Sequence, residues 1–167
     1  PNGVVFASAV AMTKPVSLAD RLWFQRLVQT RRFSIGEYSI GRFSGKPTVV
    51  LGYPVLDHTG RLIAVFAAGL DLERLQRALL TIDLPAGANL NVIDSNGTVL
   101  IRYPDPEKFA GKKMPENFLV KTMLTQKEGA MTKVGLDALP RLYGYKTVGS
   151  GVEAIHISVG IPAQVAY

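Results

Sequence analysis

Apolar and polar residues alternate along this chain at two different periods, and each change of period marks a new element. The residue types typical of strands are clearest in residues 48–55 and 62–70, two runs that are rich in β-branched and aromatic residues. Between them, residues 57–60 read Asp-His-Thr-Gly, a sequence typical of a short turn. The pattern predicts a β-hairpin, approached through the glycine-punctuated segment 33–47, around which the rest of the chain is organised.

Helical spacing appears on both sides of this hairpin. Ser17 precedes a run whose apolar residues recur at helical spacing as far as Thr30. Asp71 precedes a second run with leucines at positions 72, 75 and 79, which ends before the Pro-Ala-Gly sequence at 85–87. Serine and aspartate are both good N-caps, so we expect helices over residues 18–30 and 72–84.

The second half of the chain repeats this mixture of strands and helices. We expect a helix that starts at Pro115 and is ended by Gly129. Strands are expected over residues 90–93, 98–103, 141–148 and 152–161. The Asn-Gly pair at 96–97 lies before one of these strands, as the pair at 2–3 lies before the apolar residues 4–6.

This repetition indicates an α+β chain with two tandem units, each an antiparallel sheet flanked by helices. The predicted units are residues 1–84 and 85–167. A domain seldom begins on a turn, so we also expect a helical segment upstream of Pro1.

Composition narrows the class of protein further. The 167 residues are 47% hydrophobic and 19% charged, which is a globular composition, and the chain has no cysteine. The net charge of +6 suits an anionic partner, but the basic residues are scattered and form no patch typical of nucleic-acid binding. The longest mostly apolar run, residues 62–72, is far shorter than the roughly 20 residues that a membrane span needs.

Five sequence blocks carry a family resemblance over nearly the whole chain. They are RLWF from Arg21, GEYSIGRFSGKP from Gly36, LGYPVLDHTG from Leu51, AAGLDL from Ala67 and VIDSNGTVLIRYPDPEKFAGK from Val92. With these blocks the chain resembles double Cache (tandem PAS-like) sensor domains, which project outside bacterial membranes. The resemblance implies that the first unit is membrane-distal and binds the ligand, that its long N-terminal helix is missing here, and that the smaller second unit is membrane-proximal.

The resemblance also implies a function. Such domains control histidine kinases, diguanylate cyclases and chemoreceptors, act as receptor homodimers and are tethered to the inner membrane by flanking segments. The chain is therefore expected to be the periplasmic sensor of a histidine kinase, and not an enzyme by itself. The alternatives are a diguanylate cyclase sensor, a chemoreceptor sensor, or a structural or protein-interaction module that binds no ligand.

Candidate ligand-binding residues follow from the amino-acid-binding members of that family. Arg21 and Trp23 match their R-x-W block, with Val16 at the position of a leading tyrosine, and Tyr38 and Asp71 match a later tyrosine and aspartate. Arginine binds carboxylates through two hydrogen bonds, and aspartate accepts hydrogen bonds from an ammonium group. The expected ligand is a small organic anion or zwitterion, and Gly41 and Tyr53 complete the predicted site.

Other interpretations of these residues stay open at this point. Arg21 could pair with Asp20 or Glu37, Trp23 could be a core residue, and Asp71 could be only a helix cap. No catalytic residue, metal ligand or cofactor is expected, because His58 lies in a turn and His156 has no acidic neighbour at metal spacing. The sequence 94–97 resembles a calcium loop but is better explained as a turn.

Overall fold

The computed structural model describes residues 2–79 and 81–164 as two compact units, Pro1–Leu72 and Glu73–Tyr167. The sequence placed this boundary after residue 84, beyond the second helix. In the structure it lies where that helix begins, and Leu72, the last residue of the first unit, is buried. The assignment of one unit as membrane-distal and the other as membrane-proximal stays a prediction.

The first unit is built on the predicted hairpin, strands β3 (Pro47–Leu56) and β4 (Leu62–Asp71). The two strands pair antiparallel from Thr48 opposite Asp71 to Leu56 opposite Leu62. Two short strands, β1 (Ser34–Ile35) and β2 (Ser39–Ile40), pair with different parts of β3. In the turn, Asp57 Oδ1 accepts hydrogen bonds from the backbone N–H groups of Thr59 and Arg61, both at 2.9 Å. The predicted hairpin is therefore confirmed.

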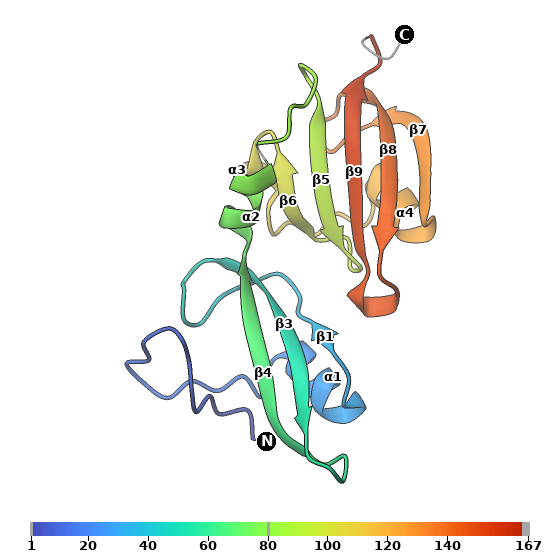
Figure 1. Ribbon diagram of the computed structural model, residues 1–167. Helices are drawn as coiled ribbons and strands as arrows, with labels where there is room; N and C mark the ends of the chain where they lie inside the picture. The colour runs from blue at the N-terminus through green and yellow to red at the C-terminus, as the bar shows by residue number, and fades with distance from the viewer. Residues whose placement is uncertain (1, 80, 165–167) are drawn as a thin grey trace. The chain divides into compact units, whose positions relative to one another are not determined.

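Helix α1 (Leu22–Thr30) lies against β3, as Figure 1 shows. Its buried residues Trp23, Phe24 and Leu27 form the core of this unit. The sheet has glycine beneath the indole: a Cβ on Gly52 would lie 2.6 Å from Trp23 Cζ3, and one on Gly36 would lie 2.8 Å from Trp23 Cδ1. Side-chain-free positions on the sheet therefore allow the helix to approach closely.

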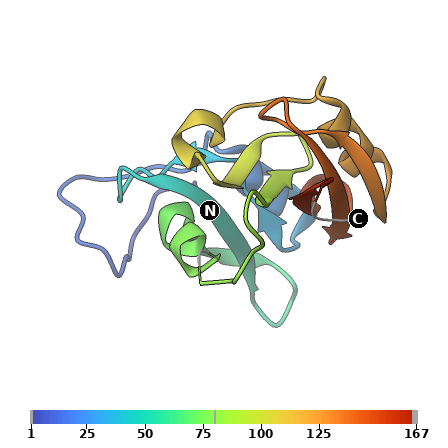
Figure 2. The ribbon, with the colours of Figure 1, turned by 90° about the horizontal axis from the view of Figure 1, so that it is seen from above.

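The start of the first unit differs from the sequence prediction. Helix α1 begins at Leu22, not at residue 18, and the expected strand at 4–6 is reduced to a single bridge between Val4 and Ser17. Ser17 is held in this bridge, so it cannot cap the helix. Residues 5–16 form a loop that extends from the sheet in both views (Figures 1 and 2).

The second unit contains a five-stranded antiparallel sheet in the order β6-β5-β9-β8-β7. Its strands are β5 (Asn89–Asp94), β6 (Val99–Tyr103), β7 (Glu128–Val134), β8 (Pro140–Val148) and β9 (Ile155–Pro162). Helix α4 (Phe118–Thr125) packs against this sheet, as both views show (Figures 1 and 2). The core between them contains Ile93, Val99, Leu119, Val120, Met123, Leu136, Tyr143 and Tyr145.

Several elements of this unit differ in their bounds from the prediction. Helix α2 (Leu72–Leu79) ends earlier, and α4 begins after Asn117, whose side chain accepts hydrogen bonds from the N–H groups of Leu119 and Val120. Helix α3 (Pro106–Phe109), strand β7 and the short 3-10 helix η1 (Gly151–Glu153) were not predicted. Strand β7 has mostly exposed residues, so it lacks the alternation that marks a half-buried strand.

The α+β class with antiparallel sheets is confirmed. Within the described part of the chain, no helix combines the length and the apolar character that crossing a membrane requires.

Candidate ligand-binding site

Arg21 is the N-cap residue of α1 and is half-buried. The two carboxylates that it could have paired with have other partners. Asp20 pairs with Arg42 through Oδ1–Nη1 and Oδ2–Nη2 distances of 2.8 and 2.5 Å, and this hydrogen bonding lowers the pKa of Asp20. Glu37 pairs with Arg26 at 3.0 Å. Within the described residues the Arg21 guanidinium makes no hydrogen bond or ion pair, so it is available to a ligand carboxylate.

The hairpin face beneath α1 has small residues beyond the tryptophan. Gly52 faces α1, and side chains that lie directly opposite each other in an antiparallel pair share one face, so Ala67 faces the same way. Gly69 and Asp71 follow on that face at alternate positions of β4. Ala67 and Gly69 are exposed and have little or no side chain, which leaves room above the sheet for a small ligand.

Asp71 ends β4 at this edge of the sheet and directly precedes α2. Its side chain is half-buried, and its Oδ2 lies 3.8 Å from Lys46 Nζ. Gly41 lies at the same edge, because a Cβ on it would be 3.0 Å from Thr48 Oγ1, and Thr48 is the strand partner of Asp71. The structure thus brings Gly41 and Asp71 together, as the sequence predicted.

Trp23 is 3% exposed and lies edge-to-face against Phe24, with ring centres 5.8 Å apart. It contacts the sheet from within the core, so its structural role is to anchor α1 and thereby to position Arg21. Tyr38 lies between β1 and β2 and is half-buried. Contact of the Trp23 and Tyr38 side chains with a ligand stays a prediction.

Tyr53 lies apart from the other predicted site residues. It follows Gly52 directly, so its side chain projects from the opposite face of the sheet, and it is 61% exposed. Along β3 it is five residues from Thr48, a distance of about 17 Å. Tyr53 and Asp71 thus project from opposite faces of the sheet and are five residues apart in register, and a role for Tyr53 in the same site stays a prediction.

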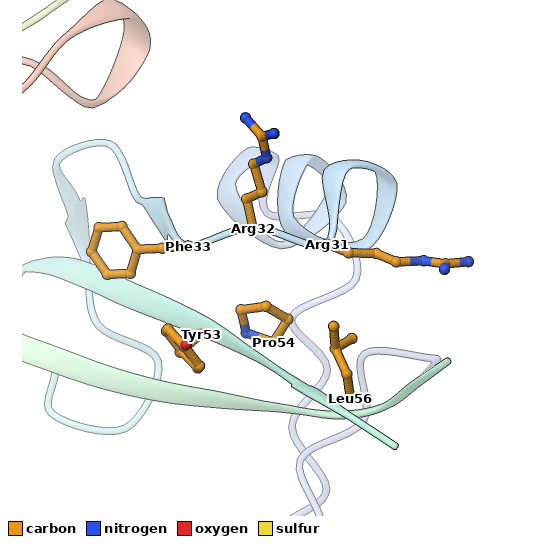
Figure 3. Close-up of a pocket in the computed structure, with 6 residues that line it drawn as sticks. All are labelled: Arg31, Arg32, Phe33, Tyr53, Pro54 and Leu56. Atoms are coloured by element: carbon orange, nitrogen blue, oxygen red, sulfur yellow. The ribbon is translucent and has the colours of Figure 1, made fainter. Parts of the chain in front are cut away.

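Tyr53 instead lines an open hollow of about 490 Å³ with residues that the sequence analysis did not select (Figure 3). These are Arg31, Arg32, Phe33, Pro54 and Leu56. Arg31 donates to the carbonyl of Gly60 at 3.0 Å, and in Figure 3 both guanidinium groups point away from Tyr53 and Pro54. Ligand sites have polar groups that converge on one point. The charged groups of this hollow diverge, so we do not place the ligand there.

The two histidines and the 94–97 turn lie in different structural settings. His58 is exposed in the hairpin turn, and His156 is buried in the second unit with its Nδ1 2.8 Å from Thr147 Oγ1. Asp94 Oδ1 accepts from the N–H groups of Asn96 and Thr98 at 2.9 and 2.8 Å, which is the geometry of a turn. Among residues 2–79 and 81–164, no three acidic or histidine side chains are grouped closely enough to hold a metal ion.

Antiparallel sheets with helices packed against them place this chain among the PAS-like sensor folds, which bind ligands and carry no catalytic machinery of their own. A family model of the Cache domain matches residues 1–162, and the chain belongs to this family. Comparison with curated protein sequences gives no match.

Solved structures with the same fold share little sequence with this chain. An extracellular domain assigned to a histidine kinase, rpHK1S-Z16, has a TM-score of 0.83 at 20% identity and is matched over 99% of this chain and 68% of its own. The periplasmic sensory domain of the Campylobacter jejuni chemoreceptor Tlp1 has a TM-score of 0.72 at 15% identity, and the match covers 90% of this chain and 59% of that domain. The ligand-binding domain of the Pseudomonas fluorescens chemoreceptor CtaA, in complex with L-isoleucine, has a TM-score of 0.68 at 15% identity. This match covers 94% of this chain and 63% of that domain. The chain thus spans about three fifths to two thirds of these domains.

Proposed function

We propose that this chain is the periplasmic double Cache sensor of a bacterial inner-membrane signalling protein, most consistent with a histidine kinase of a two-component system. Its first unit binds a small organic anion or zwitterion. Binding changes the relative free energies of two receptor conformations and so regulates the cytoplasmic output. In the complete protein the sensor acts as a homodimer tethered to the membrane through flanking segments.

The observation that supports ligand binding is the position of Arg21. Arg21, a half-buried residue at the start of α1, has no side-chain partner among the residues that the structure describes, while two neighbouring carboxylates pair with Arg26 and Arg42. The exposed small residues Ala67 and Gly69 and the carboxylate of Asp71 follow on the hairpin face that α1 covers. In this proposal Arg21 binds the carboxylate and Asp71 the ammonium group of a zwitterion such as an amino acid.

The ligands bound in several structures of the same fold are also zwitterions. CtaA is in complex with L-isoleucine, the Pseudomonas aeruginosa receptor PctB with L-Arg and with L-Gln, and Mlp24 with asparagine. All of these ligands carry a carboxylate and an ammonium group. They support an amino acid as the first ligand class to test, with simple carboxylates as the second.

Two alternatives to this proposal concern the output domain and the binding of a ligand. The output could be that of a chemoreceptor or a diguanylate cyclase, which the same sensor fold would serve equally well. The chain could also be a structural or protein-interaction module that binds no small ligand.

A thermal-shift screen of amino acids and small carboxylates separates ligand binding from a purely structural role. A ligand that binds only the native state raises the melting temperature as its concentration rises. At a hundredfold excess over Kd, it increases the free energy of unfolding by about 2.7 kcal/mol. We expect at least one carboxylate-bearing compound to do so, and Arg21→Ala to abolish the effect. If no such compound raises the melting temperature, the structural module becomes the better proposal.

A further inference from the structure

The inner face of the second unit's sheet contains a buried polar cluster beside its apolar core. This cluster, called here the Arg102 cluster, consists of Asn89, Asn91, Arg102, Asp137, Arg141 and Tyr143. The Arg102 side chain is completely buried, and its guanidinium carbon lies 4.9 Å from the centre of the Phe109 ring. Arginine is almost never fully buried unless it is paired, so its partners decide what the cluster can bind.

Two guanidinium groups in this cluster share one carboxylate. Asp137 Oδ2 lies 2.6 Å from Arg102 Nη2, and Asp137 Oδ1 lies 2.7 Å from Arg141 Nη1. In the described part of the chain, no second carboxylate pairs with either arginine. The cluster therefore holds one positive charge in excess, and burial lowers the pKa of Arg102 despite the attraction of Asp137. Two buried guanidinium groups thus depend on a single carboxylate, whichever group supplies it.

The hydrogen bonds of Arg102 are also incomplete. Its Nη1 donates to Asn91 Oδ1 at 2.6 Å and its Nη2 donates to Asp137, but its buried Nε has no acceptor. Asp137 thus uses only one of the two nitrogens along that edge of the guanidinium. A carboxylate that is free to turn can accept from Nε and Nη2 together, which is the paired geometry that arginine favours.

Asp137 reaches the cluster from a turn, whereas both arginines are held by strands. The turn follows the last pair of the β7–β8 ladder, Val134 opposite Pro140, and contains Ala138 with a φ of 60° and Leu139, which is 53% exposed. Departure of the Asp137 side chain would break its bonds to Arg102, Arg141 and the Leu139 N–H group but no strand pairing. What it leaves behind is the space of a carboxymethyl group, which matches acetate.

We propose that the Arg102 cluster is a second ligand site, specific for a small monocarboxylate, and that Asp137 occupies it as an internal substitute when no ligand is bound. The entering carboxylate takes the position of Asp137 between Arg102 and Arg141 and also accepts from Arg102 Nε. This site lies wholly within the second unit, and it does not depend on the site proposed in the first. A sensor with two such sites responds to two compounds.

Wild-type protein provides the deciding measurement. A carboxylate tethered by a short chain competes with an effective concentration on the order of millimolar, so acetate must be added above that range. We expect acetate, and not chloride at equal ionic strength, to shift the Arg102 Nε–Hε resonance in an NMR titration until it saturates. An Nε–Hε signal that does not respond to acetate overturns the proposal.

Asp137→Ala tests the role of the turn. Removal of the competing carboxylate is expected to tighten acetate binding by calorimetry at least about tenfold, the difference that a charge-assisted pair makes. Glu128→Ala, which removes a carboxylate that pairs with Lys146 at the surface of the same unit, is the control and should leave acetate binding unchanged. If Asp137→Ala binds acetate while the wild-type signal stays silent, Asp137 is a permanent structural partner and the proposal is wrong. If Asp137→Ala does not fold, the wild-type titration still decides.

Discussion

At the scale of single residues, the ligand binding proposed for the first unit depends on Arg21, whose guanidinium makes no hydrogen bond or ion pair within residues 2–79 and 81–164. Arg21→Ala should weaken binding of a carboxylate ligand roughly ten- to a hundredfold, since a charge-assisted pair contributes about 1.5–3 kcal/mol. Calorimetry with the ligand found in the screen measures the change. The matched control is Arg32→Ala, an exposed arginine after the other end of α1 that should bind as wild type does. Equal affinities for Arg21→Ala and wild type would place the site elsewhere.

Asp71 distinguishes the two ligand classes. Asp71→Asn keeps the size of the side chain but removes the charge that an ammonium group requires. We expect this substitution to weaken the binding of an amino acid about tenfold or more and to leave the affinity for a simple carboxylate nearly unchanged. Loss of both affinities together would mean that Asp71 maintains the fold of the site, through Lys46 or the start of α2, and does not contact the ligand.

His156 predicts how the stability of the second unit depends on pH. Burial lowers the pKa of His156 below 6.5, although a backbone hydrogen bond at Met123 and the charge of Asp94 oppose the shift. As pH falls through 6.5, the unfolded chain takes up a proton before the folded chain does. Stability should therefore fall by up to about 1.4 kcal/mol per pH unit until the folded-state pKa is reached.

Urea unfolding at pH 7 and below measures this slope. His156→Gln should flatten it, because glutamine does not titrate, while His58→Gln in the exposed hairpin turn should not. A wild-type slope that His156→Gln leaves unchanged would assign the pH dependence to other groups.

At the scale of elements, the packing of α1 on β3 depends on glycine. A Cβ on Gly52 would lie 2.6 and 2.7 Å from two atoms of the buried Trp23 ring, so Gly52→Ala should destabilise the first unit by about 1–3 kcal/mol. Gly144 on β8 is the matched control, because a Cβ there would have no atom within 4 Å. In chemical denaturation, the free energy of unfolding of Gly144→Ala should lie within about 0.5 kcal/mol of the wild-type value. Similar losses for the two variants would contradict this account of the packing.

At the scale of the whole molecule, each unit has a core of its own. The cluster around Trp23 belongs to the first unit and the cluster around Tyr143 to the second. Units with separate cores open separately. Hydrogen exchange should therefore show that Gly52→Ala lowers amide protection in β3 and β4 and leaves β5, β8 and β9 protected. Equal loss of protection in both units would show that they unfold as one.

The elements that the sequence predicted correctly are those whose signal is local. The hairpin of β3 and β4 has strands rich in β-branched and aromatic residues and the Asp57 turn, and these are properties of neighbouring residues. The α+β class followed from the same periodicities. Strand β7 was not predicted because its residues are mostly exposed on both faces. Ser17 does not cap the helix because it forms a bridge with Val4, which is distant in sequence.

The arrangement of charges was decided by the tertiary structure alone. By itself the sequence identified Arg21 and Asp71 as candidates, because they match positions in the amino-acid-binding members of the family that the chain resembles. It could not show that Asp20 and Glu37 pair with Arg42 and Arg26, nor that Tyr53 projects from the other face of the sheet. It also missed Arg102, although a lone arginine at the end of an apolar strand, beside alternating asparagines, was a signal. Which carboxylate meets which arginine depends on segments far apart in the chain, such as the 35 residues between Arg102 and Asp137, and only folding brings them together.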